Sequence, residues 1–461
     1  MIDTQMQCSK IQFEERVYPR RHKDSKTISA YVQSLEAGAE FPPILIQRVI
    51  NDGAQYAIVL DGAHRIEAYR EIKRKDIAVR YYKDEALDLN DNWIELRLVS
   101  AQANSHHGLR GSNEDNKETA RIIAENDPKK KYTESMVAKS LGVTQPTVHN
   151  WIYDIRARQS ASRNNLIYRL NGLGWTQEEI ANIDGRNQPA IAGIIKNINY
   201  DKIDNSLKAG KSIEEVAAFE GLDLTLTWAL ALEGKTDEER MESLGEDIRK
   251  FTVWNYSDAN DLMGHSAFHG RMPGQITLNT LYWFTKPGDL VIDPMSGSGT
   301  TIDACLLMGR KCYGYDKNPF KERQDILKND ITQGFPNKKP DFIFVNPPYW
   351  TMIDYNDEGI SIEDFYHLLD CLAKESYEAL PEKGRIAVLM GNQSAQSFLP
   401  EGVNRLDHVD KEREYFLKAG FEKEWSIQCP MPTQGANRWA QKEWDNHRLA
   451  EITRELTIWK K

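Results

Sequence analysis

Cysteine is scarce in this sequence, and no two cysteines have the close spacing of a Cys-x-x-Cys pair. The chain has only five of them: Cys8, Cys305, Cys312, Cys371 and Cys429. Zinc sites and disulfide scaffolds depend on close or regular cysteine spacing. The sequence therefore predicts no metal site and no disulfide framework, and it favours a reducing compartment.

Long apolar runs are missing as well. No stretch approaches the ~18 apolar residues of a membrane-spanning helix. Residues 1–5 lack the basic segment and apolar core of a secretory signal. We therefore expect a cytoplasmic protein that has no membrane partner.

Positive charge is outnumbered, with 59 Lys and Arg against 69 Asp and Glu and a net charge of −10 at pH 7. This acidic total is only a weak argument against a nucleic-acid partner, because it averages over domains that can differ. With 461 residues, the chain is long enough for two to four domains. Charge therefore has to be read region by region.

Residues 1–110 show the mixed pattern of a small α/β domain. Asn51-Asp52-Gly53 indicates a hairpin turn between two apolar runs. The predicted elements of this region are strands at 44–50, 56–60 and 77–82 and a helix at 65–73.

Residues 111–246 have few strand-like runs and contain an internal repeat. Tyr132-Thr133-Glu134 recurs as Trp175-Thr176-Gln177, and at the same offset Gly142 recurs as Gly185. Each copy indicates a capped helix, a glycine turn and a second helix with proline near its start, which is the layout of a helix-turn-helix. Residues 212–231 resemble a degraded third copy. We expect an all-α middle region.

Residues 251–461 alternate between strand-like and helix-like runs, which predicts a parallel α/β sheet. A further sheet strand is predicted at 386–390. Residues 425–428 and 455–459 are predicted to form a closing antiparallel pair, and the polar stretch 233–240 is interpreted as the linker before this domain.

A glycine-rich turn follows the apolar strand at 290–292. Residues 293–301 read DPMSGSGTT, with no Lys of a phosphate loop. Bare glycine backbone and the free N–H groups of a following helix suit a polar ligand. The next strand, 311–315, ends in Asp316, the position at which doubly wound folds bind a ribose diol. We predict a nucleoside cofactor, and S-adenosylmethionine fits.

A second strand, 341–345, ends in Asn346-Pro347-Pro348-Tyr349. The prolines stiffen a loop at the usual ligand edge of such a sheet. The Asn oxygen and a backbone carbonyl can each accept a hydrogen from one exocyclic NH₂, and the Tyr ring can stack on its plane. The pattern predicts a pocket for a flat, amine-bearing ring.

These two motifs, over residues 251–461, resemble those of the S-adenosylmethionine-dependent DNA methyltransferases that modify adenine N6 or cytosine N4. The family's motifs are DPxxGSGT and [DNS]PP[YFW]. The resemblance implies a Rossmann-like domain, S-adenosylmethionine as cofactor and double-stranded DNA as partner. The cofactor-binding residues it implies are Asp293, Pro294, Ser296, Gly297, Ser298, Gly299, Thr300 and Asp316, together with Asp330 and, in the upstream segment 269–276, Pro273.

The mechanism implied by the resemblance is direct methyl transfer to a base that has been flipped out of the duplex. Asn346 and the Pro347 carbonyl would bind the amine hydrogens, and Tyr349 would stack on the base, with Pro348 completing the catalytic set. Catalysis would then come from positioning and electrostatics, with no metal. In the family, Asn at the first catalytic position occurs mostly in adenine-N6 enzymes, so Asn346 favours adenine.

Residues 1–110 resemble the ParB/sulfiredoxin-like N-terminal domain through Gly62-Ala63-His64-Arg65 at a predicted helix start. In that superfamily the turn can bind nucleotide phosphates. The alternative is a strand–turn–helix corner with Arg65 in an ion pair. Ala63 stands where sulfiredoxins have a reactive cysteine, so no reductase activity is expected. A nucleotide at this domain and a homodimer are both left open.

Residues 128–170 carry a local excess of positive charge, which fits a face that contacts DNA phosphates. The start of the second helix of the first copy is where base contacts would come from. The predicted DNA-binding residues are Thr144, Gln145, Thr147, His149, Arg156, Arg158, Lys129, Lys130 and Lys131. We expect the regions before about residue 250 to select the DNA site.

Other functions remain as alternatives. The nearest is cytosine-N4 methylation of DNA, and NPPY also occurs in enzymes that methylate RNA bases or a protein glutamine. The helix-turn-helix units argue against RNA or protein. A ParB-like DNA-binding regulatory protein with an inactive methyltransferase fold is a further alternative, against which the intact motifs argue. The recognised site, and a partner nuclease as in restriction-modification, are left open.

Overall fold

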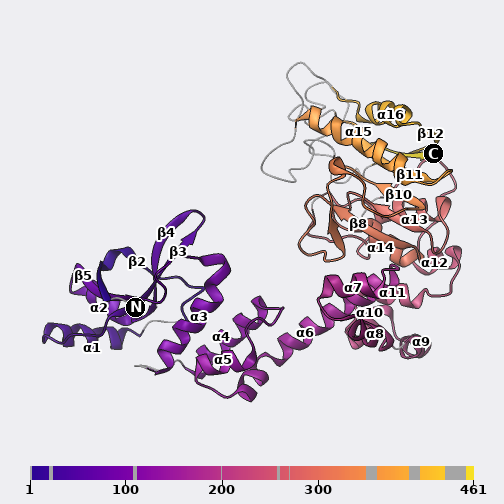
Figure 1. Ribbon diagram of the computed structural model, residues 1–461. Coiled ribbons are helices and arrows are strands. Elements are labelled where there is room, and N and C mark those ends of the chain that lie inside the picture. The colour runs from indigo at the N-terminus through magenta and orange to yellow at the C-terminus, as the bar shows by residue number, and fades with distance from the viewer. Residues whose placement is uncertain are drawn as a thin grey trace, which may run out of the picture. The chain divides into compact units, whose positions relative to one another are not determined.

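The computed structural model describes residues 3–19, 24–106, 112–198, 200–256, 260–268, 270–348, 361–393, 405–430 and 453–461. The chain divides into two units, residues 1–160 and 161–461, and each is described by itself (Figure 1). Among the helices of the described ranges, none combines the length and the apolar character that a membrane crossing requires.

The first unit contains a six-stranded sheet in the order β1-β5-β3-β4-β2, with β6 paired to β3. The predicted hairpin is confirmed, because β3 and β4 pair antiparallel across a turn in which Asp52 and Gly53 have positive φ of 49° and 77°. The predicted strands and helix are confirmed too. The elements are β1 (Asp3–Gln7), η1 (Cys8–Lys10), β2 (Ile11–Gln12), α1 (Ser25–Glu36), β3 (Ile44–Asn51), β4 (Ala54–Asp61), α2 (Ala63–Glu71), β5 (Asp76–Tyr81) and β6 (Leu87–Asp88).

Helices complete the first unit. They are α3 (Leu89–His106), α4 (Asn113–Asn126), α5 (Glu134–Leu141) and the first part of α6 (Gln145–Gly172). A separate apolar core lies among them, to which Leu98, Ile123, Val137, Val148 and Ile152 contribute buried side chains. The boundary between the two units falls inside α6.

All three predicted helix pairs are present: α5 with α6, α7 (Gln177–Asp184) with α8 (Gln188–Lys196), and α10 (Ile213–Glu220) with α11 (Leu224–Ala231). The first helix of each pair begins after a Thr or Ser N-cap and ends at a glycine with left-handed backbone: Thr133 and Gly142, Thr176 and Gly185, Ser212 and Gly221. A left-handed residue that ends a helix favours glycine, which explains why glycine recurs. The use of these pairs in binding DNA stays a prediction.

The second unit is built on a seven-stranded sheet in the order β12-β13-β11-β10-β7-β8-β9. Five strands are parallel: β7 (Leu290–Asp293), β8 (Lys311–Asp316), β9 (Ile326–Lys328), β10 (Phe342–Val345) and β11 (Arg385–Gly391). The last strand, β13 (Arg454–Lys460), is antiparallel to both β11 and β12 (Glu422–Gln428). The predicted parallel sheet and its closing antiparallel pair are therefore confirmed.

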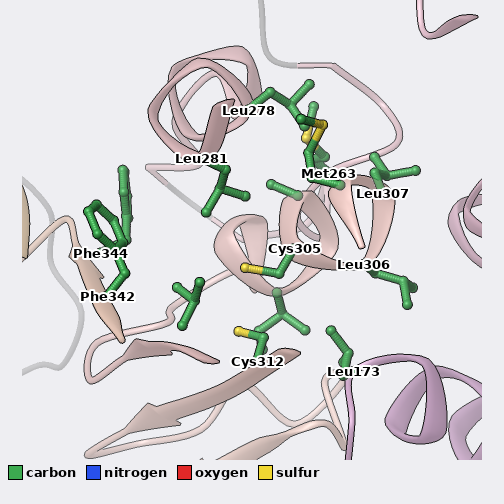
Figure 2. Packing of buried hydrophobic residues seen from close by; sticks show 14 of the residues in the cluster. Leu173, Met263, Leu278, Leu281, Cys305, Leu306, Leu307, Cys312, Phe342 and Phe344 are labelled. Carbon is green, nitrogen blue, oxygen red and sulfur yellow. The ribbon is translucent and has the colours of Figure 1, made fainter. Parts of the chain in front are cut away.

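The core of the second unit lies on both faces of this sheet. Along β10, Phe342 and Phe344 belong to one cluster, and Ile343 and Val345 belong to the other, as the alternation of a strand requires. Figure 2 shows part of the first cluster, in which Phe342, Phe344 and Leu281 are labelled. The remaining helices are α9 (Tyr200–Lys208), α12 (Asp237–Ser243), α13 (Gly274–Phe284), α14 (Thr300–Met308), η2 (Ile331–Gln333), α15 (Ile362–Ala379) and α16 (His408–Ala419).

The helical segment that begins at residue 161 shares this core. Leu173 lies near Leu306 and Cys312 (Figure 2), and its carbonyl accepts a hydrogen bond of 3.0 Å from the Cys312 N–H. Trp175 stacks on Tyr313 of β8 at 4.6 Å between ring centroids and donates to the Cys312 carbonyl at 2.8 Å. The second helix pair is therefore packed against the sheet of its own unit.

The interpretation of residues 233–240 as a linker is wrong. Thr236 and Glu239 form a capping box that starts α12, and Arg240 and Met241 are buried. Asp237 makes a bidentate pair with the fully buried Arg310, at 2.5 and 2.7 Å. The polar composition of this stretch concealed the helix α12, in which Asp237 pairs with Arg310 of the same unit.

Candidate active site

The glycine turn and the Asn-Pro-Pro loop follow neighbouring parallel strands. Ile292 of β7 pairs with Ile343 of β10, so Asp293 and Asn346 leave the sheet at the same edge. Adjacent strands lie ~4.8 Å apart, which brings the two loops together. The carboxyl edge of a parallel sheet is where such folds bind ligands. This is the arrangement that the sequence predicted.

The glycine turn has the backbone that its sequence requires. Gly297 and Gly299 have positive φ of 46° and 82°, and α14 begins at Thr300. The Ser296 hydroxyl donates to the Asp293 carbonyl at 3.0 Å, and the hydroxyls of Ser298 and Thr300 lie 2.9 Å apart. The turn therefore presents bare backbone at a helix N-terminus, which suits a polar ligand.

Asp316 lies at the end of β8, beside this turn. One carboxylate oxygen accepts from the Gly297 N–H at 3.0 Å, and the other accepts from the Asn318 N–H at 2.9 Å. Burial raises the pKa of this carboxyl, against the lowering effect of the two N–H groups. Asp316 thus lies at the predicted strand end and is bonded to the glycine turn, and its contact with a ribose stays a prediction.

Asp293 is buried between β7 and the turn, and its carboxylate accepts from the Met295 N–H at 2.9 Å. Burial raises the pKa of Asp293 to about 7, although hydrogen bonds from Thr301 and Met295 act in the lowering direction. The folded protein therefore favours the neutral form of this group more than the unfolded chain does.

Asp293→Asn is expected to stabilise the protein at pH 8 and to change it little at pH 4. Because the folded pKa is raised, the stability linked to Asp293 is complete only below about pH 4 and is lost progressively as the pH rises to about 7. Thermal unfolding without cofactor should show the variant gaining roughly 5 °C over the native chain at pH 8. An equal difference at pH 4 and pH 8 would contradict this assignment.

Aromatic side chains that the sequence did not single out lie over the turn. The Phe268 ring packs against Phe320 at 5.4 Å, and His265 packs against the same Phe320 at 5.2 Å. A side chain at Gly297 would come within 3.1 Å of the Phe268 ring. Phe268 and Phe320 are far apart in the sequence and are brought together only by the fold. No local sequence motif could therefore have indicated this contact.

The catalytic loop is described as far as Pro348. Asn346 and Pro348 are half-buried and Pro347 is buried, directly after β10. Tyr349 lies outside the described residues, as does His269 of the upstream segment. The three described positions lie at the carboxyl edge of the sheet, and their contact with a base stays a prediction.

The two outlying cofactor candidates have clear positions. Pro273 is buried and directly precedes α13. Asp330 caps η2, where one oxygen accepts from the Thr332 N–H and hydroxyl at 3.0 and 2.8 Å and the other pairs with Lys317 at 3.1 Å. Burial alone would raise the pKa of Asp330, but these partners lower it. A cofactor contact by either residue stays a prediction.

The DNA-binding candidates differ in how accessible they are. Lys129, Lys130, Lys131, Thr144, Gln145, His149 and Arg158 are exposed, and Thr147 is half-buried. His149 lies 3.2 Å from Glu134 and against the Tyr153 ring. Arg156 instead donates to the Asp127 carbonyl at 2.8 Å and to Gln159 at 2.9 Å. These two hydrogen bonds of Arg156 therefore join parts of the first unit to each other.

The Gly62-to-Arg65 turn forms the corner that was considered as an alternative. Arg65 pairs with Asp61 at 2.9 Å and donates to the Pro42 carbonyl at 2.7 Å. His64 accepts from the Asp24 N–H at 2.9 Å, and Gly62 has φ of 94°. The ion pair is present, and a nucleotide at this turn stays a prediction.

The residues of the second unit fit S-adenosylmethionine. The cofactor combines a nucleoside with an amino-acid tail, and the turn supplies bare backbone at Gly297 and Gly299 while Asp316 supplies a carboxylate at the neighbouring strand end. Among the described residues, no group of three His, Cys, Asp or Glu side chains is arranged to hold a metal ion.

Comparisons with solved structures give only distant likenesses. TrmN from Thermus thermophilus is 16% identical, over 42% of this chain and 50% of that one, with a TM-score of 0.27. ParB from Caulobacter crescentus complexed to parS is 14% identical, over 47% and 97%, with a TM-score of 0.24. A Burkholderia thailandensis 1,6-didemethyltoxoflavin-N1-methyltransferase is 13% identical, over 41% and 76%, with a TM-score of 0.28. The chain thus spans half the length of the TrmN that it matches.

No curated protein matches the chain. Two family models do: the ParB N-terminal domain matches residues 2–95, and the DNA methylase family of N6 and N4 enzymes matches residues 67–328. The second match includes the glycine turn and Asp316 and ends before Asn346. It covers more than half of the chain, and with the motifs it assigns S-adenosylmethionine as the cofactor. The chain therefore belongs to the DNA methylase family, with a ParB-like domain at its N-terminal end.

Proposed function

We propose that this protein is a site-specific DNA methyltransferase that acts on the exocyclic N6 of a flipped adenine. The observation that carries the proposal is the position of Asn346 directly after β10, beside the strand that leads into the glycine turn. Two neighbouring strand ends then hold the methyl donor and the amine. This juxtaposition supports transfer between them in one step.

An exocyclic amine is a weak nucleophile because its lone pair is delocalised into the ring. The Asn346 side-chain oxygen and the Pro347 carbonyl would each accept one amine hydrogen, which favours the pyramidal form with a localised lone pair. Tyr349 would stack on the ring. The cofactor supplies a methyl group on a sulfonium, and the loop holds the amine in line with it.

Removal of the base from the duplex is part of the proposal, because a base amine inside a duplex is not accessible to such a loop. The buried strand β10 supports a rigid Asn-Pro-Pro backbone, since Pro347 is itself buried. A rigid loop loses little entropy when the base binds, and this supports catalysis by positioning.

The choice of adenine over cytosine rests on Asn346 and is tested by nucleoside analysis. Plasmid DNA without prior methylation is incubated with the protein and S-adenosylmethionine, digested and analysed by mass. N6-methyladenine supports the proposal. N4-methylcytosine would keep the mechanism and replace the base, which is the alternative that the family match leaves equally open.

DNA binding by the first unit is expected to depend on Lys129, Lys130 and Lys131. These exposed lysines precede α5 and face solvent. Replacing all three with alanine should weaken duplex binding roughly tenfold. The slope of log K against log salt concentration should become less steep by about two to three, since each phosphate contact releases counterions. Fluorescence anisotropy with a labelled duplex over a salt series measures both.

A matched control removes the same charge elsewhere in the first unit. Lys26, Lys73 and Lys75 are also exposed but lie outside the helix pair. Their replacement by alanine should leave the salt slope nearly unchanged. Equal slopes for the two triple variants would remove Lys129 to Lys131 from the DNA-binding face.

A further inference from the structure

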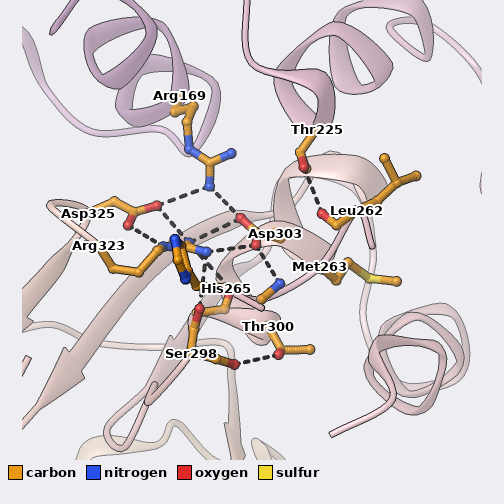
Figure 3. Close-up of polar contacts among 12 residues, drawn as sticks. Arg169, Thr225, Leu262, Met263, His265, Ser298, Thr300, Asp303, Arg323 and Asp325 are labelled. Atoms are coloured by element: carbon orange, nitrogen blue, oxygen red, sulfur yellow. Dashed lines mark hydrogen bonds and ion pairs between the residues drawn. The ribbon is translucent and has the colours of Figure 1, made fainter. Parts of the chain in front are cut away.

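Charged side chains form a cluster beside the glycine turn (Figure 3), which is buried except for Asp223, whose side chain is 42% exposed. Its members are Arg169, Asp223, Asp303, Arg323 and Asp325. Arg323, Asp303 and Asp325 have side chains only 9%, 5% and 3% exposed. We refer to these five residues as the ion-pair cluster. It lies within the second unit and uses residues from four separate parts of the chain, because Arg323 and Asp325 lie two positions apart.

Arg323 is the member that contacts the turn. Its guanidinium pairs with Asp303 at 2.7 Å and with both oxygens of Asp325 at 2.8 Å. The same guanidinium donates to the carbonyls of Ser298 and Gly299, at 3.2 and 3.4 Å. A β-carbon at Gly299 would overlap this guanidinium. Glycine at 299 is thus required by Arg323 as well as by its backbone.

Asp303 connects the cluster to the segment above the turn. It accepts from the Gly264 N–H at 2.8 Å, and the adjacent His265 N–H donates to the Ser298 carbonyl at 3.0 Å. Arg169 of α6 pairs with Asp303, with Asp325 at 3.0 Å and with Asp223 at 3.1 Å. The helical segment, the upstream loop and the glycine turn are therefore all bonded to one set of charges.

A buried ion pair is a weak source of stability, because desolvating the charges offsets most of their attraction. The planar guanidinium, however, donates in fixed directions and can hold several acceptors in one geometry. In this cluster the acceptors include the carbonyls of Ser298 and Gly299, which belong to the turn that would contact the cofactor. The arrangement favours a role in shaping the turn.

We propose that Arg323 is a positioning residue for the cofactor, which holds the Ser298 and Gly299 carbonyls and thereby keeps the glycine turn in its ligand-binding shape. Arg169 of α6 pairs with Asp303 and Asp325, and these two carboxylates in turn orient the Arg323 guanidinium. The proposal rests on the proposed function in one respect, namely that S-adenosylmethionine binds at this turn.

The test compares Arg323→Lys with Arg310→Lys in the full chain. Arg310 is a matched control, because it is fully buried and pairs with Asp237 in the same unit without contacting the turn in any described bond. Calorimetry with S-adenosylmethionine alone measures the Kd, and methyl-transfer assays give KM and kcat. Arg323→Lys should raise the Kd and the cofactor KM at least about tenfold, because it removes hydrogen bonds from a charged group, and leave kcat within about threefold.

Arg310→Lys should lower the Tm while leaving the Kd within about twofold of the native value. The proposal is overturned if Arg323→Lys lowers the Tm as Arg310→Lys does and binds the cofactor as tightly as the native chain. Should Arg323→Lys not fold, Asp325→Asn removes the negative charge and one of the two acceptor oxygens that face Arg323. An unchanged Kd in that variant would also overturn the proposal. If the native chain itself binds no S-adenosylmethionine, the cofactor assignment fails together with the proposal.

Discussion

Asn346→Ala is expected to lower the rate of methyl transfer to DNA at least about a hundredfold, the effect typical of removing one pre-positioned polar group from an active site. The Asn346 oxygen would accept one of the two amine hydrogens, and alanine offers no acceptor. Affinity for S-adenosylmethionine should change little, because the glycine turn and Asp316 follow other strands. Single-turnover transfer and cofactor calorimetry measure the two quantities separately.

Asn346→Asp serves as the matched control for this variant. Aspartate keeps an oxygen acceptor at the same distance from the backbone, so it should retain a measurable part of the activity that alanine loses. If the alanine variant methylates DNA at the native rate, the loop after β10 is not the site of transfer. If it loses cofactor affinity to the same extent as activity, Asn346 belongs to the cofactor site.

Removal of the first unit, residues 1–160, is expected to weaken the use of DNA as a substrate strongly. A fragment of residues 161–461 should fold and bind S-adenosylmethionine, because it is a compact unit that contains its whole core. Without α5 and the exposed lysines before it, its KM for DNA should rise by a factor of about one hundred or more, given the affinity that phosphate contacts supply. Its preference for one DNA sequence should disappear.

The position of the cut decides whether this experiment is informative. A fragment that starts at residue 251 would lose Ile167, Trp175, Ile180 and Met241, all of which are buried in the core of the second unit. It would also leave Arg310 buried without Asp237. We expect that fragment to be insoluble. Native sequence preference in the 161–461 fragment would contradict site selection by the first unit and assign it to the second.

Much of the catalytic edge could be predicted from the sequence, because its signals are local. The glycine turn, Asp316 and the Asn346 loop each follow an apolar strand, and parallel pairing places neighbouring strand ends at one edge. The closing pair of β12 and β13 was equally readable from its alternating residues. Helix pairs were predictable because Thr133, Thr176 and Ser212 are N-caps that stand before glycines at regular offsets.

The rest depends on contacts between distant residues. Arg169 was counted as part of a phosphate-facing surface, yet its guanidinium pairs with Asp303 and Asp325, which lie far along the chain. Asp237 looked like part of a linker for the same reason, since its partner Arg310 is equally distant. A count of charged residues gives only their types and does not show which of them pair inside the fold. Hence the sequence suggested one helical region over residues 111–246, whereas in the structure its part from residue 161 onward belongs to the second unit.

The class of macromolecule that receives the methyl group decides whether the proposed function is correct. The full chain is incubated with methyl-labelled S-adenosylmethionine and a mixture of duplex DNA, RNA and protein, and the label in each fraction is counted after separation. We expect label in DNA with the native chain and no label in DNA with Asn346→Ala. Label confined to RNA or to protein, or label in DNA that Asn346→Ala leaves unchanged, would contradict the proposed function.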